Sequence, residues 1–577
     1  MPETAWVEGD RPWFAYYEKG TVRSIGIPDR MLHELVGDAV RRWPNRTALI
    51  YYGAKWSYRR FWQESERLAA SLVRDGIRPG DRVAIYLPNC PAYPIAYFAA
   101  LRVGASVAQI SPLYLGQDLQ RLLEDSKPKL LVTLEILYPN LAKIADQVPL
   151  PVLYVARLRE FYPFWKRPFV NAVLRRRGMS TSFPSAPNVR SWAHSIRSPG
   201  TITEFHGDPA GTVAVLQYTG GTTGKPQAAM LTHRNLVANA LQSHAWFAPE
   251  ASDRDVILAA IPFFHVYGMT VALNYPLLDG MTIVMQTRPE VNELLGLIDK
   301  YRPTQFPGVP ALYQAINLHP KVSRYNIRSI KVCLSGSAPL PLEVARQFEA
   351  LTGGNLVEGY GLTEASPVTH ANPIRGERRP RSIGLPLPDT DQQIRSLEDG
   401  TQPVATGETG ELLVRGPQVM LGYYNQPAET ALVLQDGWLR TGDIARLDAD
   451  GFCYIVDRKK DLIIVGGFKV YPREVEEVLF QHPEVADAAV IGIPSADRGE
   501  VVKAFVVRKP GATVTEAALI QFVRDRIAHY KAPRVIEFRT ALPRSGIQKV
   551  LRRVLREDTT GEAASAPTSP GSTDREK

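Results

Sequence analysis

The chain has 577 residues, more than a single hydrophobic core usually accommodates, so we expect two or more domains. With 45% hydrophobic and 22% charged residues, its composition falls in the range of soluble globular proteins and disfavours a disordered chain. The N-terminus carries acidic residues where a signal peptide would be apolar, and no apolar run approaches the roughly eighteen residues of a membrane span. A cytoplasmic protein is therefore expected.

The cysteines argue against a disulfide framework. Cys90, Cys333 and Cys453 are far apart, and each lies beside apolar residues. An odd number of cysteines without metal-ligand spacing predicts buried free thiols and no zinc site.

Much of the net charge of +9 is concentrated in residues 157–177. Seven Lys and Arg residues stand there against one acid, Glu160, and five aromatic residues interleave with them. Pro168 is well placed to open a helix. Such a segment suits an anionic membrane surface as well as nucleic acid, and an ordinary solvated loop and helix is the third alternative. For the whole chain we expect no nucleic-acid partner, and a peripheral contact with the inner face of the membrane stays open.

Helices and strands alternate along most of the first 350 residues. Apolar residues at helical spacing predict helices from about residues 31, 58 and 91, and Thr232 is a suitable N-cap for a fourth. Alternation of this kind indicates an α/β fold with parallel-rich sheets covered on both faces. The expected strands are 48–52, 82–87, 129–133, 212–216, 256–258, 281–284 and 330–334.

The later part of the chain has a different pattern of residues. From about 392 to 457, short segments divided by Gly and Pro predict a β-rich subdomain, which completes an N-terminal domain of residues 1–457. The charged residues 458–461 are the expected hinge, and a compact α/β domain of residues 462–556 follows. Residues 557–577 are rich in small and polar residues and are predicted to be disordered.

A loop rich in glycine and threonine follows one of the predicted strands and runs from Tyr218 to Lys225. Glycines that let the backbone approach a ligand, two hydroxyl groups and a lysine together are suited to holding phosphate. It is not a Walker A loop, because three residues separate Gly220 from Gly224 and Pro226 follows the lysine.

Four further stretches follow this loop in order: residues 335–340, 358–364, 441–443 and 458–472. Together with the loop they resemble the ordered motifs of the adenylate-forming (ANL) superfamily, whose members include acyl-CoA synthetases, luciferases and adenylation domains. The resemblance covers about residues 31–553 and is strongest to bacterial long-chain fatty acyl-CoA synthetases. It implies a large N-terminal domain, a β-rich subdomain and a small mobile C-terminal α/β domain.

The resemblance also implies a nucleotide site. Tyr360 corresponds to the aromatic residue beside adenine, and Asp443 and Arg458 correspond to the contacts with the ribose. Glu364 and Thr222 are the expected Mg²⁺ ligands and are also counted as catalytic. The residues expected to contact ATP or CoA are Thr219, Gly220, Gly221, Thr222, Thr223, Gly224, Lys225, Ser337, Ala338, Pro339, Glu358, Gly359, Tyr360, Gly361, Thr363, Asp443, Arg458, Lys460, Gly466 and Gly467.

Two further residues match catalytic positions of the family. His265 corresponds to the position near the acyl carboxylate, and Lys549 to the lysine that stabilises charge between this carboxylate and the α-phosphate. Long-chain members can carry a tryptophan four residues after the histidine, where this chain has Met269. Lys460 matches the hinge position, and the Gly466–Gly467 pair matches the strand beside the thiol tunnel.

The chain departs from the family pattern at two places. Gln227 and Ala228 stand where the family usually has Lys-Gly, and Gln548 replaces the glycine before the catalytic lysine. The first change removes a cation near the pyrophosphate, for which Lys225 is a potential substitute. The second adds a side chain where a flexible turn is expected.

The resemblance implies an acid–thiol ligase that joins a fatty acid to CoA, and the expected fatty acid is a long-chain one. Its substrates are the fatty acid, ATP and CoA; Mg²⁺ is the metal, and AMP and pyrophosphate are released after an acyl-adenylate intermediate. Homodimers are frequent in the family. The alternatives are an aryl-acid CoA ligase, an acyl-AMP ligase, or a catalytically weakened nucleotide- or lipid-binding protein.

Overall fold

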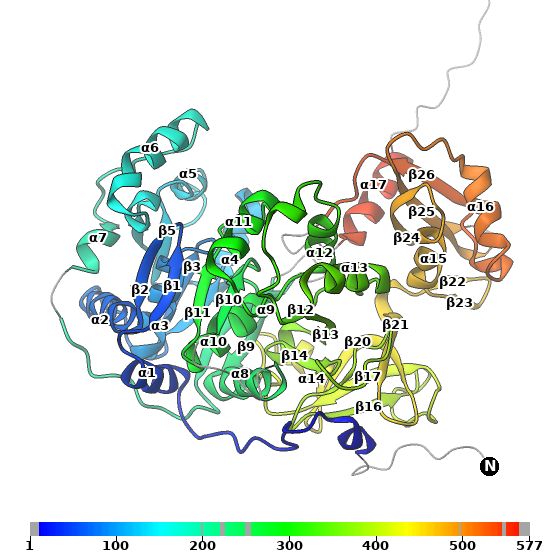
Figure 1. The fold of residues 1–577 in the computed structure, drawn as a ribbon, viewed down its shortest axis with the longest axis horizontal. Helices are drawn as coiled ribbons and strands as arrows, with labels where there is room; N and C mark the ends of the chain where they lie inside the picture. Colours follow the sequence, from blue (N-terminus) through cyan, green and yellow to red (C-terminus); the bar gives the residue numbers. More distant parts are fainter. Residues whose placement is uncertain are drawn as a thin grey trace, which may run out of the picture.

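The computed structural model describes residues 11–197, 200–219, 226–247, 255–495, 498–544 and 550–564. The strands of this part form five sheets flanked by helices (Figure 1). The fifth sheet and its helices, drawn in orange and red, follow residue 462 and lie at one end of the molecule. Among the described helices, none combines the length and hydropathy that a membrane crossing requires.

The largest sheet of the described chain has eight strands. Neighbouring residues of its strands pack on opposite faces: Val83 and Ile85 join the core under α3, and Ala84 and Tyr86 join the core under α4. The sheet is parallel except at β9 and β18, and it is covered on both faces as expected. Across the sheet the strands are β18 (Gly422–Tyr423), β9 (Gln227–Thr232), β8 (Val213–Thr219), β4 (Ser106–Gln109), β3 (Arg82–Tyr86), β5 (Leu130–Leu134), β6 (Val152–Ala156) and β7 (Val189–Ser191).

Two four-stranded sheets lie beside it. In the first, β10, β11 and β1 are parallel and β2 forms a hairpin with β1. In the second, β12 and β13 are parallel, and single bridges through Gln305 connect this sheet to β10. The strands are β10 (Val256–Ala259), β11 (Thr282–Met285), β1 (Thr47–Tyr51) and β2 (Ala54–Ser57), then β12 (Val332–Ser335), β13 (Asn355–Gly361), β14 (Val368–Ala371) and β15 (Leu385–Pro386).

The β-rich subdomain forms a five-stranded antiparallel sheet, as the short segments divided by Gly and Pro predicted. Its strands are β16 (Asp391–Arg395), β17 (Gly410–Arg415), β20 (Trp438–Leu447), β19 (Leu434–Gln435) and β21 (Cys453–Arg458).

The C-terminal part has its own sheet and its own hydrophobic core. The sheet consists of β22 (Ile463–Val465), β23 (Phe468–Val470), β24 (Val485–Ser495), β25 (Gly499–Arg508) and β26 (Val535–Arg539), with α15 (Pro472–Phe480), α16 (Glu516–Arg524) and α17 (Arg552–Ala564). Helix α17 continues eight residues beyond the domain end expected at 556, so residues 557–564 are helical and not disordered. Residues 565–577 lie outside the described part.

Two of the longer helices of the N-terminal part begin at side-chain caps. Ser57 Oγ accepts the Arg60 amide at the start of α2, and Thr232 Oγ1 accepts the Asn235 amide at the start of α8, as the sequence predicted. The helices are α1 (Leu32–Arg42), α2 (Tyr58–Arg74), α3 (Ala92–Arg102), α4 (Gly116–Ser126), α5 (Tyr138–Ala142), α6 (Arg167–Arg176), α7 (Trp192–Ser195), α8 (His233–Phe247), α9 (Val266–Met269), α10 (Tyr275–Leu278), α11 (Val291–Tyr301), α12 (Pro310–Asn317), α13 (Leu342–Thr352) and α14 (Pro427–Val433).

Short turns complete the architecture. They include the 3₁₀ turns η1 (Pro12–Tyr16), η2 (Leu158–Phe161), η3 (Phe164–Lys166), η5 (Val322–Arg324), η6 (Thr363–Ala365), η7 (Lys459–Asp461) and η8 (His529–Lys531), and the π-helical turn η4 (Thr270–Asn274). Cys90, Cys333 and Cys453 are all buried free thiols, as expected.

Candidate functional site

The two strands that flank the glycine-threonine loop form an antiparallel pair. Thr219 ends β8 and lies opposite Gln227, the first residue of β9. The side-chain amide of Gln426 donates to the carbonyl oxygen of Pro226 at 2.8 Å. These contacts hold the two ends of the loop close together, where β8 ends and β9 begins. The other expected loop residues, Gly220, Gly221, Thr222, Thr223, Gly224 and Lys225, lie outside the described part, as do Gln548 and Lys549.

The departure at Gln227 and Ala228 falls within β9. The methyl group of Ala228 is buried, and its carbonyl oxygen accepts the amide of Tyr424 at 2.8 Å. The residues that replace the family's Lys-Gly are therefore part of a strand pair that supports the loop.

Tyr360 and Asp443, which the sequence placed in separate motifs, are in direct contact. The phenol of Tyr360 donates to Asp443 Oδ2 at 2.5 Å, and burial together with the Asp443 charge raises the Tyr360 pKa well above its usual value. Asp443 on β20 lies opposite Arg458 on β21, with 3.4 Å between Oδ1 and Nε. The Asp443 amide also donates to Thr441 Oγ1 at 3.1 Å. An aromatic ring, a carboxylate and a guanidinium thus converge from two sheets.

The glycines beside Tyr360 are required by close packing. A Cβ atom on Gly359 would collide with the Leu334 side chain, and one on Gly361 would collide with the carbonyl oxygen of Pro367. Because backbone cannot move aside as a flexible side chain can, position 361 admits only glycine without rearrangement.

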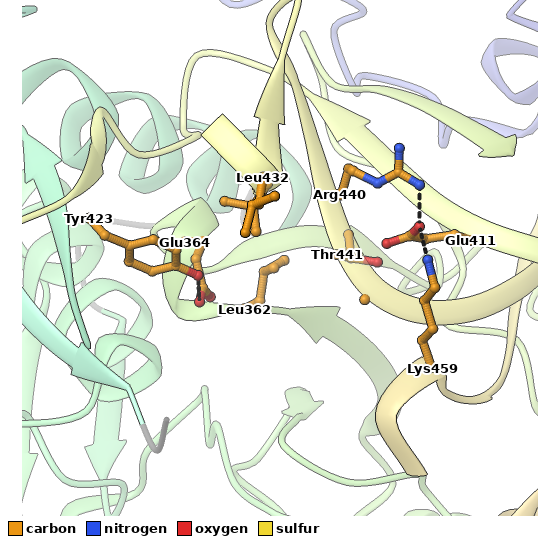
Figure 2. Close-up of a pocket in the computed structure, with 10 residues that line it drawn as sticks. Leu362, Glu364, Glu411, Tyr423, Leu432, Arg440, Thr441 and Lys459 are labelled. Atoms are coloured by element: carbon orange, nitrogen blue, oxygen red, sulfur yellow. Dashed lines mark hydrogen bonds and ion pairs between the residues drawn. The ribbon is translucent and has the colours of Figure 1, made fainter. Parts of the chain in front are cut away.

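Glu364 lies on η6 in a pocket of about 260 Å³ (Figure 2). Its Oε1 accepts the phenol of Tyr423 at 2.8 Å, and burial with the Glu364 charge raises the Tyr423 pKa. Thr363 precedes Glu364 on the same turn. Tyr423 was not among the predicted site residues, because no local pattern marks a tyrosine that reaches a carboxylate 59 residues away.

A second group in the pocket was also missed. Glu411, whose side chain is almost fully buried, accepts from Arg440 at 2.6 Å and from Lys459 at 3.1 Å (Figure 2). This ion-pair group connects β17 and β20 to η7, within the expected hinge. It fixes the pocket wall formed by Thr441 and Gly442.

The histidine motif lies against the strand that leads into the glycine-threonine loop. His265 caps α9, and its Nδ1 accepts the Tyr267 amide at 3.3 Å. The side-chain amide of Gln217 on β8 donates to the carbonyl oxygen of Phe264 at 3.1 Å. The histidine motif and the glycine-threonine loop are therefore connected through β8.

The loop after β12 contacts the same motif. Tyr267 donates to the carbonyl oxygen of Leu334 at 2.6 Å, and its ring lies beside Gly336. Ser337 has a positive φ of 69° and is partly exposed. The two following residues of the expected nucleotide set, Ala338 and Pro339, are exposed.

Two buried carboxyl groups lie where the C-terminal part meets β13 and β21. Burial raises the pKa of Glu358 to about 7, against the opposing charge of Arg473. Burial also raises the pKa of Asp457 to about 6, although its Oδ2 accepts the backbone amide of Arg473 at 2.8 Å. The start of α15 therefore packs against two groups whose ionisation is unfavourable.

The expected hinge forms the turn η7 and adjoins a buried ion-pair network. Asp461 accepts from Arg552 at 3.2 Å and from Arg556 at 2.8 Å, and Arg552 also pairs with Glu476 at 2.7 Å. Lys460 itself is exposed, between these groups and Arg458. The turn between β22 and β23 contains Gly466 and Gly467, with φ values of 57° and 87° that favour glycine.

Two family models match separate parts of the chain, and curated relatives match almost all of it. Residues 36–424 match the model "AMP-binding enzyme", and residues 474–549 match "AMP-binding enzyme C-terminal domain". The chain belongs to the AMP-binding enzyme family, within the adenylate-forming superfamily that its motifs resemble. The predictions of family and fold class are thus confirmed.

Two curated relatives carry the name Long-chain-fatty-acid--CoA ligase. The protein from Bacillus subtilis is 42% identical over 96% of this chain and 99% of its own length, and that from Escherichia coli O157:H7 is 36% identical over 95% and 98%. Among solved structures, ATP-bound MatB from Rhodopseudomonas palustris superposes with a TM-score of 0.78 at 30% identity, covering 91% of this chain and 98% of that one.

Proposed function

We infer that this protein is an ATP-dependent long-chain fatty acid–CoA ligase that acts through an acyl-adenylate. The observation that carries the inference is the near full-length identity of 36–42% to ligases of that name. The convergence of Tyr360, Asp443 and Arg458 beside the Glu364 pocket supports the same reaction. Activation by ATP is chemically necessary, because a carboxylate is a poor electrophile and needs a good leaving group.

The residues fit a nucleotide. The Asp443 carboxylate can accept both ribose hydroxyls, and Arg458 opposite it can hydrogen-bond the same sugar. The Tyr360 ring offers a flat apolar surface for adenine, while its phenol fixes the Asp443 carboxylate. The loop at residues 219–225 would supply backbone amides and hydroxyls to the phosphates.

The residues also fit Mg²⁺ bound mainly through phosphate. Mg²⁺ in such enzymes usually takes one or two protein carboxylates together with substrate oxygens and water. Glu364 provides one carboxylate in the pocket, and the described residues contain no cluster of three or more His, Cys, Asp and Glu that could hold a metal. When bound, the metal would neutralise phosphate charge. In this proposal Glu364 and Thr222 are its protein ligands.

The transfer steps use residues from both parts of the chain. His265 positions the fatty carboxylate, and Lys549 stabilises the negative charge that develops between this carboxylate and the α-phosphate. The C-terminal domain then turns about Lys460, which brings the Gly466–Gly467 turn to the path of the CoA thiol. Adenylation and thiolation thereby share one site in succession.

Two predicted interactions, one with a membrane and one with a second copy of the chain, are also part of the proposal. Residues 157–177 are proposed to contact the inner face of the membrane, where a long-chain substrate is concentrated. A homodimer is expected from the resemblance alone, and light scattering during size-exclusion chromatography would test it.

Substrate assays test the proposed activity. CoA-dependent AMP release should be faster with palmitate than with octanoate, and coumarate should support little turnover. Turnover with coumarate alone would replace the proposal with an aryl-acid ligase, and acyl-AMP that forms but never reacts with CoA would indicate an acyl-AMP ligase. ATP binding without pyrophosphate exchange on any carboxylate would indicate a weakened binding protein.

A further inference from the structure

One end of the molecule carries a group of exposed aromatic and basic side chains on η3 and α6. Phe164, Trp165 and Phe169 are 75%, 60% and 72% exposed, and Val173 is 46% exposed. Large apolar side chains rarely gather in water without a partner. We call this surface the α6 face; its members are Phe164, Trp165, Lys166, Arg167, Phe169, Val173, Arg175, Arg176 and Arg177.

Helical spacing explains the arrangement of the α6 face. Phe169 and Val173 are four residues apart and lie on one side of the helix. Val170 and Leu174, also four apart, pack against the main core on the other side. The helix therefore has one apolar face that packs against the main core. Its other apolar face is exposed and contacts no hydrophobic core of the described chain.

The α6 face is held in place by contacts to the body of the protein. Lys166 donates to the carbonyl oxygen of Tyr52 at 3.2 Å, and Arg167 donates to the carbonyl oxygens of Tyr162 and Glu160 at 3.2 Å each. The buried carboxylate of Glu135 accepts the Leu158 amide at the start of η2. The aromatic side chains are thus presented by a fixed segment.

The charges of the α6 face are uncompensated. Lys166 and Arg167 donate to backbone oxygens, which carry no net charge. Within the described part of the chain, no ion pair or side-chain hydrogen bond involves Arg175, Arg176 or Arg177. The face combines exposed apolar groups with net positive charge, at the end of the molecule remote from the C-terminal domain (Figure 1).

We propose that the α6 face docks on an anionic lipid bilayer, with Phe164, Trp165 and Phe169 entering the headgroup region and the arginines binding lipid phosphates. An amphipathic helix with aromatic residues on one side and basic residues beside them is suited to this interface. Nucleic acid would leave the helical pair Phe169 and Val173 without an apolar environment. This docking site rests on the membrane contact of the proposed function, but docking needs no turnover, so its test is independent of the ligase activity.

Vesicle sedimentation of the full-length protein tests the proposal. Binding should be strong to vesicles rich in phosphatidylglycerol, weak to phosphatidylcholine alone, and weaker at high ionic strength. The combined change Arg175→Gln, Arg176→Gln, Arg177→Gln should reduce binding about tenfold or more. The matched control changes three exposed basic residues elsewhere, Lys321→Gln, Arg324→Gln and Arg328→Gln, and should bind like wild type.

The aromatic residues have a separate test. The combined change Phe164→Ser, Trp165→Ser, Phe169→Ser should also reduce vesicle binding about tenfold or more. The control Leu318→Ser with Leu342→Ser, which removes exposed apolar groups at the end of α12 and the start of α13, should not. Equal thermal unfolding midpoints would show that all variants are folded.

Fluorescence quenching gives an independent readout of insertion. Brominated lipids should quench part of the emission of the nine tryptophans in wild type, and Trp165→Phe should abolish that part. Unchanged quenching in this variant, unchanged binding in both combined variants, or binding to duplex DNA in preference to vesicles would each overturn the proposal.

Discussion

The phenol of Tyr360 and the carboxylate of Asp443 form a 2.5 Å hydrogen bond between two different sheets. Tyr360 lies on β13 of the N-terminal part, and Asp443 lies on β20 of the β-rich sheet. The contact fixes the carboxylate before any ligand arrives, which reduces the cost of ordering it when a nucleotide binds.

Asp443→Ala should raise the KM for ATP about thirtyfold, because it removes charged hydrogen bonds worth about 2 kcal/mol. Tyr360→Phe removes only the fixing hydrogen bond and keeps the ring, so its effect on KM should be below about tenfold. Steady-state pyrophosphate exchange at varied ATP measures both. An Asp443→Ala enzyme with a KM within twofold of wild type would remove Asp443 from the ribose contact.

Glu364→Gln and Tyr423→Phe should both raise the Mg²⁺ concentration that gives half-maximal adenylation. The increase should be larger for Glu364→Gln. The phenol of Tyr423 orients the carboxylate, and loss of such an orienting partner typically costs about tenfold in metal affinity. Titration with Mg²⁺ at fixed ATP measures the shift. Tyr424→Phe is the matched control, since that neighbouring ring lies under Arg82 and not on Glu364. Equal Mg²⁺ dependence in Glu364→Gln and wild type would contradict the assignment.

The sequence predicted those elements whose pattern is local. The strand Arg82–Tyr86 has a continuous apolar run, and α8 begins after the Thr232 cap, so both were found. The strands β4, with its terminal Ser106 and Gln109, and β2, at the sheet edge, were not, because each is short and partly polar. Their structure is decided by the neighbours they pair with.

In the candidate site, too, the sequence predicted residues in local motifs but not the partners that they contact. Motif order was sufficient to single out Tyr360, Glu364 and Asp443, but their partners come from distant parts of the chain. Tyr423 lies 59 residues from Glu364, and Arg440 lies 29 residues from Glu411. Only the fold brings such pairs together, and no motif spacing in the sequence predicts them.

Lys549→Ala should reduce adenylation about a hundredfold or more while leaving thiolation of supplied acyl-AMP largely intact, because the lysine acts on charge formed only in the first step. Single-turnover assays of each half-reaction separate the two. Lys509→Ala, at an exposed lysine of the same domain, is the control and should retain both rates. Near-normal adenylation by Lys549→Ala would exclude the proposed role.

Glu358→Gln should make the stability of the protein less sensitive to a rise in pH from 4.5 to 8. The pKa of Glu358 is about 7 in the folded protein and 4.5 when exposed, so the folded state retains the proton between these values. Its contribution to stability is therefore present below pH 4.5 and is lost as the pH rises through 7, by at most about 3 kcal/mol. The glutamine cannot ionise and avoids that loss.

Thermal unfolding midpoints at several pH values measure this effect. Glu358→Gln should match wild type near pH 4.5 and unfold at a higher temperature than wild type at pH 8. Asp457, whose pKa burial raises to about 6, titrates in both proteins, so its effect cancels in the comparison. Glu398→Gln, at an exposed position, should show no pH-dependent difference. A constant offset between Glu358→Gln and wild type at every pH would show that burial of the carboxylate is not what limits stability at the α15 contact.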